Sequence, residues 1–286
     1  MKRFYVITNL QKDPDMLMAG QIRQYLEQKG AQCFLQECDR DEVCKNYHYT
    51  DPTKIPEDID CAIVLGGDGT VLQASRDLVD KNIPLFGINM GTLGYLAEVD
   101  KEHMEPALDK LLLDEYITEK RMMLEGSAYH LHKRLIRDVA LNDIVIARNG
   151  GIRIMDFLIY VNDRLLNSYS ADGIIVSTPT GSTGYSLSVG GPIVEPSASL
   201  LMITPIAPHT LNARSVILPE DAKVKIVIGE RSGAAAEAEV TFDGDTAVKM
   251  SGKDYVEIEK SQKTARFVKI DQISFLEILR RKMRGT

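Results

Sequence analysis

The most constraining feature of the chain is a glycine-rich run, Leu65-Gly66-Gly67-Asp68-Gly69-Thr70, directly after the apolar residues 61–64. An apolar run that ends in glycines is typical of a buried strand in a parallel sheet. Thr70 and Gln73 have the spacing of a capping box, which predicts that a helix begins at Val71. Strand, glycine turn and helix together indicate an α/β unit with a phosphate site in the turn, since glycines let the backbone approach an anion closely.

Asp68 is the only carboxylate of this run. Beside a bound phosphate an isolated carboxylate would repel the ligand, so its presence indicates a chemical role, either proton acceptance or metal binding. The alternative is a tight strand-to-helix turn in which Asp68 serves only as a helix cap.

The composition excludes some classes of protein. The 286 residues are enough for two domains or one large one, and the net charge of −7 argues against a nucleic-acid surface. No apolar run approaches the length of a membrane span, and the start of the chain leads into a predicted strand rather than a signal peptide. We therefore expect a cytoplasmic protein whose four cysteines are reduced, with Cys61 in the core.

The first part of the chain alternates strand and helix signals, which predicts a parallel sheet with flanking helices. Asp13-Pro14 predicts the start of a helix with proline at its first position, and Gly30 predicts its end. The other predicted elements here are strands at 4–8, 31–35, 60–65 and 84–89, a helix that ends near residue 80, and a helix at 101–113.

After residue 115 the pattern changes to short alternating strands, which predicts an all-β second domain. Strands are predicted at 135–147, 152–161, 165–169, 223–228, 237–242, 254–259 and 264–270, with turn signals at Asn149-Gly150-Gly151, Asn162-Asp163 and Asp243-Gly244. Ser274 and Glu277 form a second capping box, followed by an apolar stripe of Phe275, Ile278, Leu279 and Met283 that must be buried. The expected domains are 1–115 (α/β), 116–270 (β-rich) and 271–286, a helix that returns to the first domain.

Two further polar constellations follow predicted strands. Gly91 to Leu96 contains a second glycine loop after the strand at 84–89. Because ligands of open α/β sheets bind at the carboxyl ends of strands, this loop and residues 66–70 are expected to face one crevice, with Tyr95 stacked on a base or packed beneath the loop. Asn142-Asp143 offers an amide and a carboxylate for ribose hydroxyls or a base edge, although this dipeptide alone favours a β-bulge or turn.

The longest polar stretch runs from Ala171 to Ser186 and contains seven hydroxyl side chains between Ser177 and Ser186. Hydroxyls can donate to phosphate or amide acceptors and can also accept, so this stretch predicts a polar pocket. A serine nucleophile is excluded, because Gly181-Ser182-Thr183-Gly184 lacks the G-x-S-x-G form and His209, beside Pro208, is better placed as a turn residue than as a base.

In this order and spacing the four blocks resemble the NAD kinase family. The similarity covers nearly the whole chain: the GGDG loop, the glycine loop at 91–94, Asn142-Asp143 as the family's Asn-Glu/Asp pair, the block at 172–185, and the segments 204–209 and 242–244. The GGDG loop is shared with lipid kinases and phosphofructokinases, whereas the block at 177–185 is specific. Gly184 replaces the family's usual alanine, and Ser215 stands where proline is common.

The resemblance implies phosphorylation of the adenosine ribose 2′-hydroxyl of NAD by ATP, with Asp68 as general base. It implies that Asn142 and Asp143 hold ribose and base, that Thr183 and Tyr185 line the adenine side, and that Asp172 contacts the nicotinamide end of a neighbouring subunit's ligand. The predicted substrate-binding residues are Gly69, Tyr95, Asn142, Asp143, Asp172, Ser177, Thr180, Thr183, Gly184 and Tyr185, and the phosphate loops comprise Gly66, Gly67, Gly69, Thr70, Gly91 and Gly94.

The expected cofactor is Mg²⁺ or another divalent cation that arrives with ATP, without a dedicated carboxylate cage. The expected assembly is a homo-oligomer, a dimer or tetramer, with shared active sites. A diacylglycerol-type lipid kinase and a non-catalytic dinucleotide sensor are the alternatives. A lipid kinase should display an apolar channel, and a sensor would not need Asp68.

Overall fold

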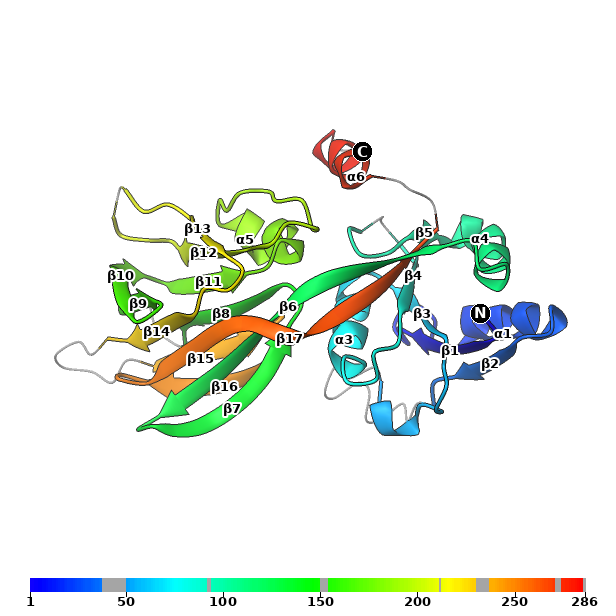
Figure 1. Ribbon diagram of the computed structural model, residues 1–286, viewed down its shortest axis with the longest axis horizontal. Coiled ribbons are helices and arrows are strands. Elements are labelled where there is room, and N and C mark those ends of the chain that lie inside the picture. The colour runs from blue at the N-terminus through cyan, green and yellow to red at the C-terminus, as the bar shows by residue number, and fades with distance from the viewer. Residues whose placement is uncertain are drawn as a thin grey trace. The chain divides into compact units, whose positions relative to one another are not determined.

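Figure 1 shows the computed structural model, which describes residues 1–37, 50–91, 94–149, 154–210, 212–229, 237–270 and 274–284. The chain forms two compact units, one of Met1–Lys120 with Thr264–Thr286, and one of Arg121–Lys263. These limits differ from the predicted limits at 115/116 and 270/271, because two long strands, β6 (Ile117–His130) and β17 (Tyr255–Lys269), each run from one unit into the other.

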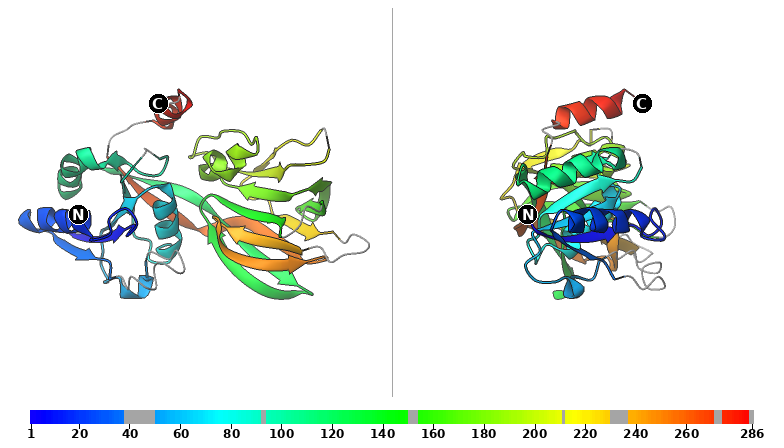
Figure 2. Two further views of the ribbon diagram at one scale, coloured as in Figure 1. Left: turned by 180° about the vertical axis from the view of Figure 1, so that it is seen from behind. Right: turned by 90° about the vertical axis from the view of Figure 1, so that its right-hand side faces the viewer.

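The first unit is built on a parallel sheet. Its strands lie in the order β2 (Gln32–Leu35), β1 (Arg3–Thr8), β3 (Cys61–Gly66) and β4 (Leu85–Asn89), and β4 also pairs in parallel with the short β5 (Val99–Asp100) and with Phe267 of β17. Helices α1 (Leu17–Gln28) and α4 (Met104–Leu112) pack on one face, and α3 (Asp68–Asp77) lies on the opposite side (Figures 1 and 2). The unit also contains the short 3-10 turns η1 (Pro52–Lys54) and η2 (Lys101–His103). The predicted parallel α/β domain is confirmed.

Two helix starts differ from the sequence prediction. The helix predicted at Asp13-Pro14 begins at Leu17, and Asp13 instead caps it from a distance by accepting the N–H groups of Met18 and Ala19 at 3.1 Å each. The helix predicted at Val71 begins at Asp68, with Gly67 as its cap. The Thr70 hydroxyl is not a cap, because it accepts a hydrogen bond from the Asn9 side chain at 3.3 Å.

The second unit is a sandwich of antiparallel strands. One sheet has the order β13 (Val216–Pro219), β12 (Leu200–Ile206), β11 (Gly173–Ser177), β8 (Asp143–Arg148), β15 (Glu237–Phe242) and β16 (Asp245–Ser251). The facing strands are β10 (Arg164–Ala171), β9 (Met155–Val161), β14 (Val224–Ile228) and β17, with β6 beside β17 and β7 (Lys133–Ala140) beside β6. The predicted β-rich domain is confirmed.

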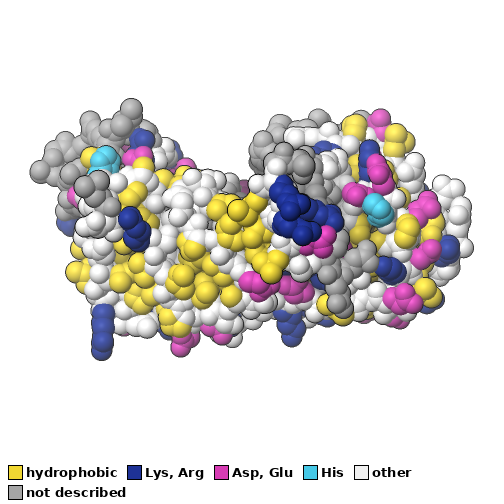
Figure 3. All heavy atoms as spheres, turned by 90° about the horizontal axis from the view of Figure 1, so that it is seen from above, with side chains coloured by type: hydrophobic (Ala, Val, Ile, Leu, Met, Phe, Trp, Pro, Cys, Tyr) yellow, Lys and Arg dark blue, Asp and Glu magenta, His cyan; other side chains and the backbone are white. Residues whose placement is uncertain are grey.

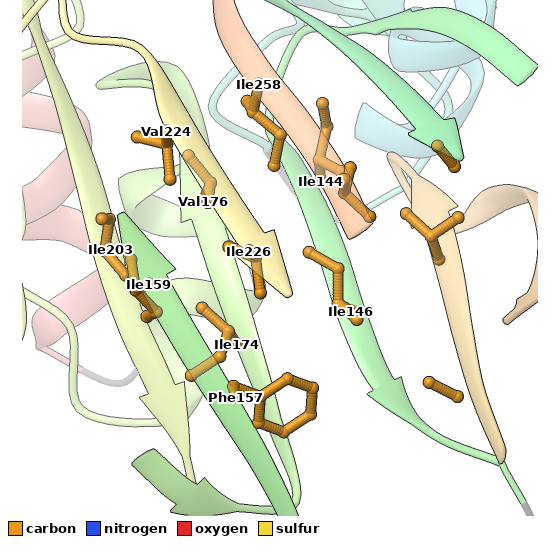
Figure 4. Packing of buried hydrophobic residues seen from close by; sticks show 14 of the residues in the cluster. Ile144, Ile146, Phe157, Ile159, Ile174, Val176, Ile203, Val224, Ile226 and Ile258 are labelled. Carbon is orange, nitrogen blue, oxygen red and sulfur yellow. The ribbon is translucent and has the colours of Figure 1, made fainter. Parts of the chain in front are cut away.

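The core of this unit lies between the two layers of strands. Figure 4 shows Ile144, Ile146, Ile174, Val176 and Ile203 of one sheet directed toward Phe157, Ile159, Val224, Ile226 and Ile258 of the other. All ten side chains are at most 1% exposed. Alternation along β14 is as predicted, with Val224, Ile226 and Ile228 buried on one face.

Some strand predictions are wrong. Residues 135–147 do not form one strand but divide into β7 and β8 around Leu141-Asn142. The two strands predicted at 254–259 and 264–270 are parts of the single strand β17, apart from their outermost residues 254 and 270. The turn predictions hold where they can be compared, since Asn162, Asp163, Asp243 and Gly244 all have positive φ. In the predicted turn at Asn149, Gly150 and Gly151 lie outside the described residues.

The last helix, α6 (Phe275–Met283), is capped by the Ser274 hydroxyl, which accepts the N–H of Glu277 at 3.2 Å. It returns to the first unit as predicted: the Phe275 ring lies 6.1 Å from that of Tyr95, and the Lys282 ammonium lies 4.6 Å from the centre of the same ring. The predicted burial of its whole apolar stripe is wrong, since Ile278 is buried but Met283 is 73% exposed. Lys and Arg side chains gather on the surface over α6 (Figure 3).

Cys33 and Cys61 are free thiols in the core of the first unit, as predicted for Cys61. Burial raises the pKa of the Cys33 thiol to about 12 and raises the pKa of Cys61 as well. Both are therefore inert packing residues at neutral pH. Cys38 and Cys44 lie outside the described residues. Within the described part of the chain, every helix is too short or too polar to cross a membrane.

Candidate active site

The carboxyl ends of β1, β3 and β4 lie at the same edge of the parallel sheet, and the glycine run follows β3 there. A Cβ on Gly66 would lie 2.2 Å from the Thr70 Oγ1 atom, so only glycine fits at the end of the strand. Gly69, in the first turn of α3, is exposed, and nothing lies within 4 Å of the position of its Cβ. The run therefore leaves the start of α3 open, and a helix start binds anions.

Asp68 is held by the second glycine loop. Its Oδ2 accepts the backbone N–H of Tyr95 at 2.8 Å, and its Oδ1 accepts the N–H of Leu96 at 3.0 Å. A Cβ on Gly94 would lie 1.8 Å from the Asp68 Oδ1 atom. The absence of a side chain at Gly94 is thus what lets the loop close on the carboxylate. Each oxygen keeps a further lone pair for a ligand.

The two loops are tied together at their bases as well. The Met90 N–H donates to the Gly66 carbonyl at 2.9 Å, and the Asn89 side chain forms two bonds of 3.1 Å with the backbone of Gly91. Residues 66–70, Gly91, Gly94 and Tyr95 are therefore brought together as predicted, while Thr92 and Leu93 lie outside the described residues. Burial, followed by the nearby Asp68 carboxylate, raises the pKa of the Tyr95 hydroxyl, whose ring packs against α6.

In the second unit, Asn142 lies in the break between β7 and β8, and Asp143 is the first residue of β8. The Asp243 carboxylate accepts three consecutive backbone N–H groups, those of Leu141 and Asn142 at 2.7 Å each and that of Asp143 at 3.1 Å. These bonds replace the sheet ladder, which explains why the predicted strand 135–147 is interrupted. In the sequence Asp243 is marked as a turn residue and as part of the family segment 242–244, but nothing local to residue 243 indicates a partner 100 residues away.

The hydroxyl-rich block packs on the other side of this break. The Thr178 hydroxyl donates to the Leu141 carbonyl at 2.6 Å, and the Thr178 N–H donates to the Asn142 carbonyl at 2.9 Å. A Cβ on Gly181 would lie 2.1 Å from the Asn142 carbonyl oxygen, and one on Gly184 would lie 3.3 Å from the Asn142 Nδ2 atom. Glycine at position 181 therefore allows the block to approach the Asn142 backbone.

This block folds as η3 (Thr180–Thr183) and α5 (Tyr185–Ser188). Tyr185 is 45% exposed and Thr183 is partly exposed, so both can reach a ligand. Ser177 and Thr180 are buried: the Ser177 hydroxyl has no hydrogen-bond partner within the described chain, and the Thr180 hydroxyl accepts from Arg121 at 3.4 Å. Their predicted contact with substrate stays a prediction.

Two sequence departures lie close to this block. Ser215 joins a chain of hydroxyls, since its Oγ is 3.0 Å from the Thr204 Oγ1 atom, which is 3.3 Å from the Ser186 Oγ atom. Proline could not make this contact. A methyl group added at Gly184 would make only ordinary or slightly tight contacts, the nearest at 3.3 Å.

Asp172 lies between β10 and β11, and its carboxylate forms an ion pair with Arg148. The Arg148 Nε donates to Oδ1 at 2.9 Å and Nη2 to Oδ2 at 3.5 Å, a two-point contact that fixes the orientation of the carboxylate. Both side chains are partly exposed, at 25% for Arg148 and 31% for Asp172. Arg148 was not predicted from the sequence, because no motif marks it.

Asp143 has an unusual ionisation. Burial, together with the negative charge of Asp243, raises the pKa of its carboxyl from 3.8 to about 7. The side chain is only 5% exposed. Below neutral pH the group is therefore a neutral acid that can donate a hydrogen bond, and above it a carboxylate that only accepts.

We expect this carboxyl to make folding pH-dependent. A carboxyl whose pKa is raised by folding stabilises the fold while protonated, and this contribution is lost as the pH rises through the folded pKa. Relative to Asp143→Asn, the free energy of unfolding of the wild type should fall between about pH 4 and about pH 7, by at most about 1.4 kcal/mol per pH unit, and then level off. Urea unfolding of both proteins over this range measures the difference, and a constant difference would contradict the raised pKa.

No three His, Cys, Asp or Glu side chains of the described residues gather so as to hold a metal ion. The polar groups at the two loops are backbone N–H groups, one carboxylate and hydroxyls. This donor set suits an anion together with a proton acceptor better than a resident metal.

Comparison with known proteins gives one family. The model of the ATP-NAD kinase N-terminal domain matches residues 7–116, and that of the C-terminal domain matches residues 141–270. The NAD kinase of Lachnospira eligens is 46% identical over 99% of this chain and 100% of its own length, and that of Lachnoclostridium phytofermentans is 43% identical over 99% of each.

Two solved structures are similar over the whole chain. A yeast NADH kinase complexed with NADH has a TM-score of 0.83 at 22% identity, covering 100% of this chain and 88% of its own, which shows a common fold. An NAD kinase from Archaeoglobus fulgidus in complex with ATP has a TM-score of 0.78 at 26% identity, covering 99% of both chains.

Proposed function

The chain belongs to the NAD kinase family, and on this premise we propose that it transfers the γ-phosphate of ATP to the 2′-hydroxyl of the adenosine ribose of NAD, giving NADP. The observation that carries the proposal is the Asp68 carboxylate, held by two backbone N–H groups beside two glycine loops. The lipid-kinase and sensor alternatives find no support in the comparisons, because the two relatives described above, which match over the full chain, are NAD kinases.

Asp68 acts on the acceptor hydroxyl. An ordinary aspartate has a pKa of about 3.9 and is too acidic to deprotonate an alcohol outright. Phosphoryl transfer usually passes through a loose transition state, in which the nucleophile loses its proton late. Asp68 therefore orients the hydroxyl and takes its proton as the new bond to phosphorus forms. The hydrogen bonds from Tyr95 and Leu96 keep the carboxylate in the orientation that this requires.

The other residues bind the two substrates. The two glycine loops approach the ATP phosphates through Gly66, Gly67, Gly69, Thr70, Gly91 and Gly94. The ribose and base are held by Asn142 and Asp143, and the adenine side is lined by Thr183, Gly184 and Tyr185. Further contacts come from Tyr95, Ser177, Thr180 and Asp172. ATP enters with Mg²⁺ or another divalent cation carried by its phosphates and water. We expect the reaction to take place in the cytoplasm, without a nucleic-acid or membrane partner.

A coupled assay tests the proposal most directly. Purified protein is incubated with NAD, ATP and Mg²⁺, and NADP is detected with an NADP-specific dehydrogenase. Formation of NADP that requires both substrates is expected. Phosphorylation of diacylglycerol instead would support the lipid kinase, and tight NAD binding without turnover of any acceptor would support the sensor.

We expect Tyr185→Ala to weaken dinucleotide binding. The ring is 45% exposed at the start of α5, so it is available to stack on adenine. Loss of one base–aromatic contact should cost about 1–3 kcal/mol, or roughly 5- to 150-fold in affinity. Calorimetric titration with NAD measures the loss, and Tyr160→Ala on β9 is the matched control. An unchanged affinity for NAD would remove Tyr185 from the adenine site.

The proposed assembly is a homo-oligomer in which Asp172 reaches the ligand of an adjacent subunit. Figure 3 shows hydrophobic side chains gathered on the surface of the second unit, whose exposed apolar residues include Leu187, Ile193 and Ile217. Contiguous apolar surface of this kind marks an interaction site, and closed symmetric assemblies are the usual arrangement of soluble oligomers.

Subunit mixing tests whether sites are shared. Asp68→Asn and Asp172→Ala oligomers should each be poorly active, and co-refolded mixtures should regain activity, because some sites then combine an intact Asp68 with an intact Asp172 from another chain. The recovery should follow the fraction of mixed species measured by native mass spectrometry. A mixed but inactive sample would mean that each chain builds its own site.

A further inference from the structure

A lysine outside every motif considered so far faces both glycine loops. Lys12 lies in the turn between β1 and α1, at the same sheet edge as the ends of β3 and β4. Its Nζ atom is 3.2 Å from the position that a Cβ would take on Gly67 and 3.6 Å from the corresponding position on Gly91. The ammonium group therefore lies over the two places where the loops carry no side chain.

The backbone that carries Lys12 is fixed to the first loop. The Asn9 N–H donates to the Leu65 carbonyl at 2.9 Å, and the Asn9 side chain donates to the Thr70 hydroxyl at 3.3 Å. The N–H groups of Lys12 and Asp13 both donate to the Asn9 carbonyl at 2.9 Å. Asn9 thus links Lys12 directly to the strand end and helix start that frame the glycine run.

The two glycine loops at this edge carry no positive side chain that could balance the charge of a bound phosphate. Residues 66–70 and 91–96 contain no lysine or arginine, and their one acidic residue is Asp68. A triphosphate bound there would meet a carboxylate in a protein of net charge −7. Lys12 is exposed and has no ion pair within the described residues, so its ammonium is available to a ligand.

We propose that Lys12 binds the β- and γ-phosphates of the phosphoryl donor and compensates the charge on the transferring group. The proposal rests on the proposed kinase activity. During transfer the bond between the γ-phosphorus and the β,γ-bridging oxygen breaks, the bond from the ribose oxygen to that phosphorus forms, and the hydroxyl proton passes to Asp68. Lys12 keeps its protons throughout and donates hydrogen bonds to phosphate oxygens, as lysines do in other phosphate sites.

The variant Lys12→Met removes the charge and keeps the length of the side chain. In the absence of NAD we expect its affinity for ATP to fall about 10- to 100-fold, the range for a hydrogen bond to a charged group, while its affinity for AMP stays unchanged. In the kinase assay kcat/KM for ATP should fall at least as much, with the affinity for NAD and the unfolding midpoint preserved. Lys12→Arg should restore part of the ATP affinity.

The matched control is Lys81→Met, which removes an exposed lysine beyond the far end of α3. It should leave ATP affinity within about twofold of the wild type, which excludes a general effect of net charge. Equal ATP affinity in Lys12→Met and wild type overturns the proposal. So does an equal loss of ATP and AMP affinity together with a lowered unfolding midpoint, because that pattern indicates a structural lysine. If the wild type makes no NADP, the proposed function fails, yet the comparison of ATP with AMP still decides the role of Lys12.

Discussion

Replacing Asp68 with asparagine is expected to lower turnover about 10²- to 10⁴-fold, the range that a positioned general base contributes, while NAD still binds. This corresponds to roughly 3–5 kcal/mol of activation free energy. Asparagine has the shape of aspartate but cannot take the hydroxyl proton. Initial rates with saturating ATP and calorimetric titration with NAD measure the two quantities. Near-normal turnover would show that Asp68 is not the general base.

The structure adds a complication to this variant. The asparagine amide has one oxygen, so the N–H of either Tyr95 or Leu96 loses the acceptor that Asp68 supplies. The variant therefore also loosens the loop. Asn89→Ala separates the effects, because it removes the two bonds that hold Gly91 in the same loop and leaves Asp68 intact. Its turnover should fall far less than that of Asp68→Asn.

The first unit could be predicted from the sequence because its signals are local. The apolar runs that become β3 and β4 are buried on both faces, as is typical of the strands of a covered parallel sheet. The start of α3 was misplaced by three residues, since Thr70 and Gln73 fit a capping box in the sequence. In the structure the Thr70 hydroxyl instead accepts a hydrogen bond from the Asn9 side chain. Asn9 is distant in the sequence, so a local sequence pattern cannot predict this bond.

The second unit shows the same limit more strongly. The pattern of β14 and β15 was sufficient to place both strands, whereas the break at Leu141-Asn142 depends on Asp243. Of the candidate site, Asp68 follows from its glycine surroundings, and Asn142 and Asp143 were assigned by resemblance to a family. The roles of Asp243, Arg148 and Lys12 were not predicted, because each acts on residues that only the folded chain brings near.

Gly94→Ala should abolish most activity although it replaces no group that takes part in the reaction. A Cβ at this position would lie 1.8 Å from the Asp68 Oδ1 atom and 2.3 Å from its Cγ atom, so the carboxylate or the loop must move. The backbone of Gly94 is outside the positive-φ region, which means that alanine is strained only by this contact. We expect turnover to fall by about 10²-fold or more, since a displacement of about 1 Å at a catalytic group has that effect.

The control for this variant is Gly20→Ala in α1, where nothing lies within 4 Å of the added Cβ. It should leave turnover unchanged and stabilise the protein by up to about 1 kcal/mol, because alanine favours a helix interior over glycine. Gly94→Ala should in addition bind NAD with an affinity close to that of the wild type, since Asn142, Asp143 and Tyr185 are untouched. A fully active Gly94→Ala protein would mean that the contact between the loop and Asp68 is dispensable, and the carboxylate would then need another group to orient it.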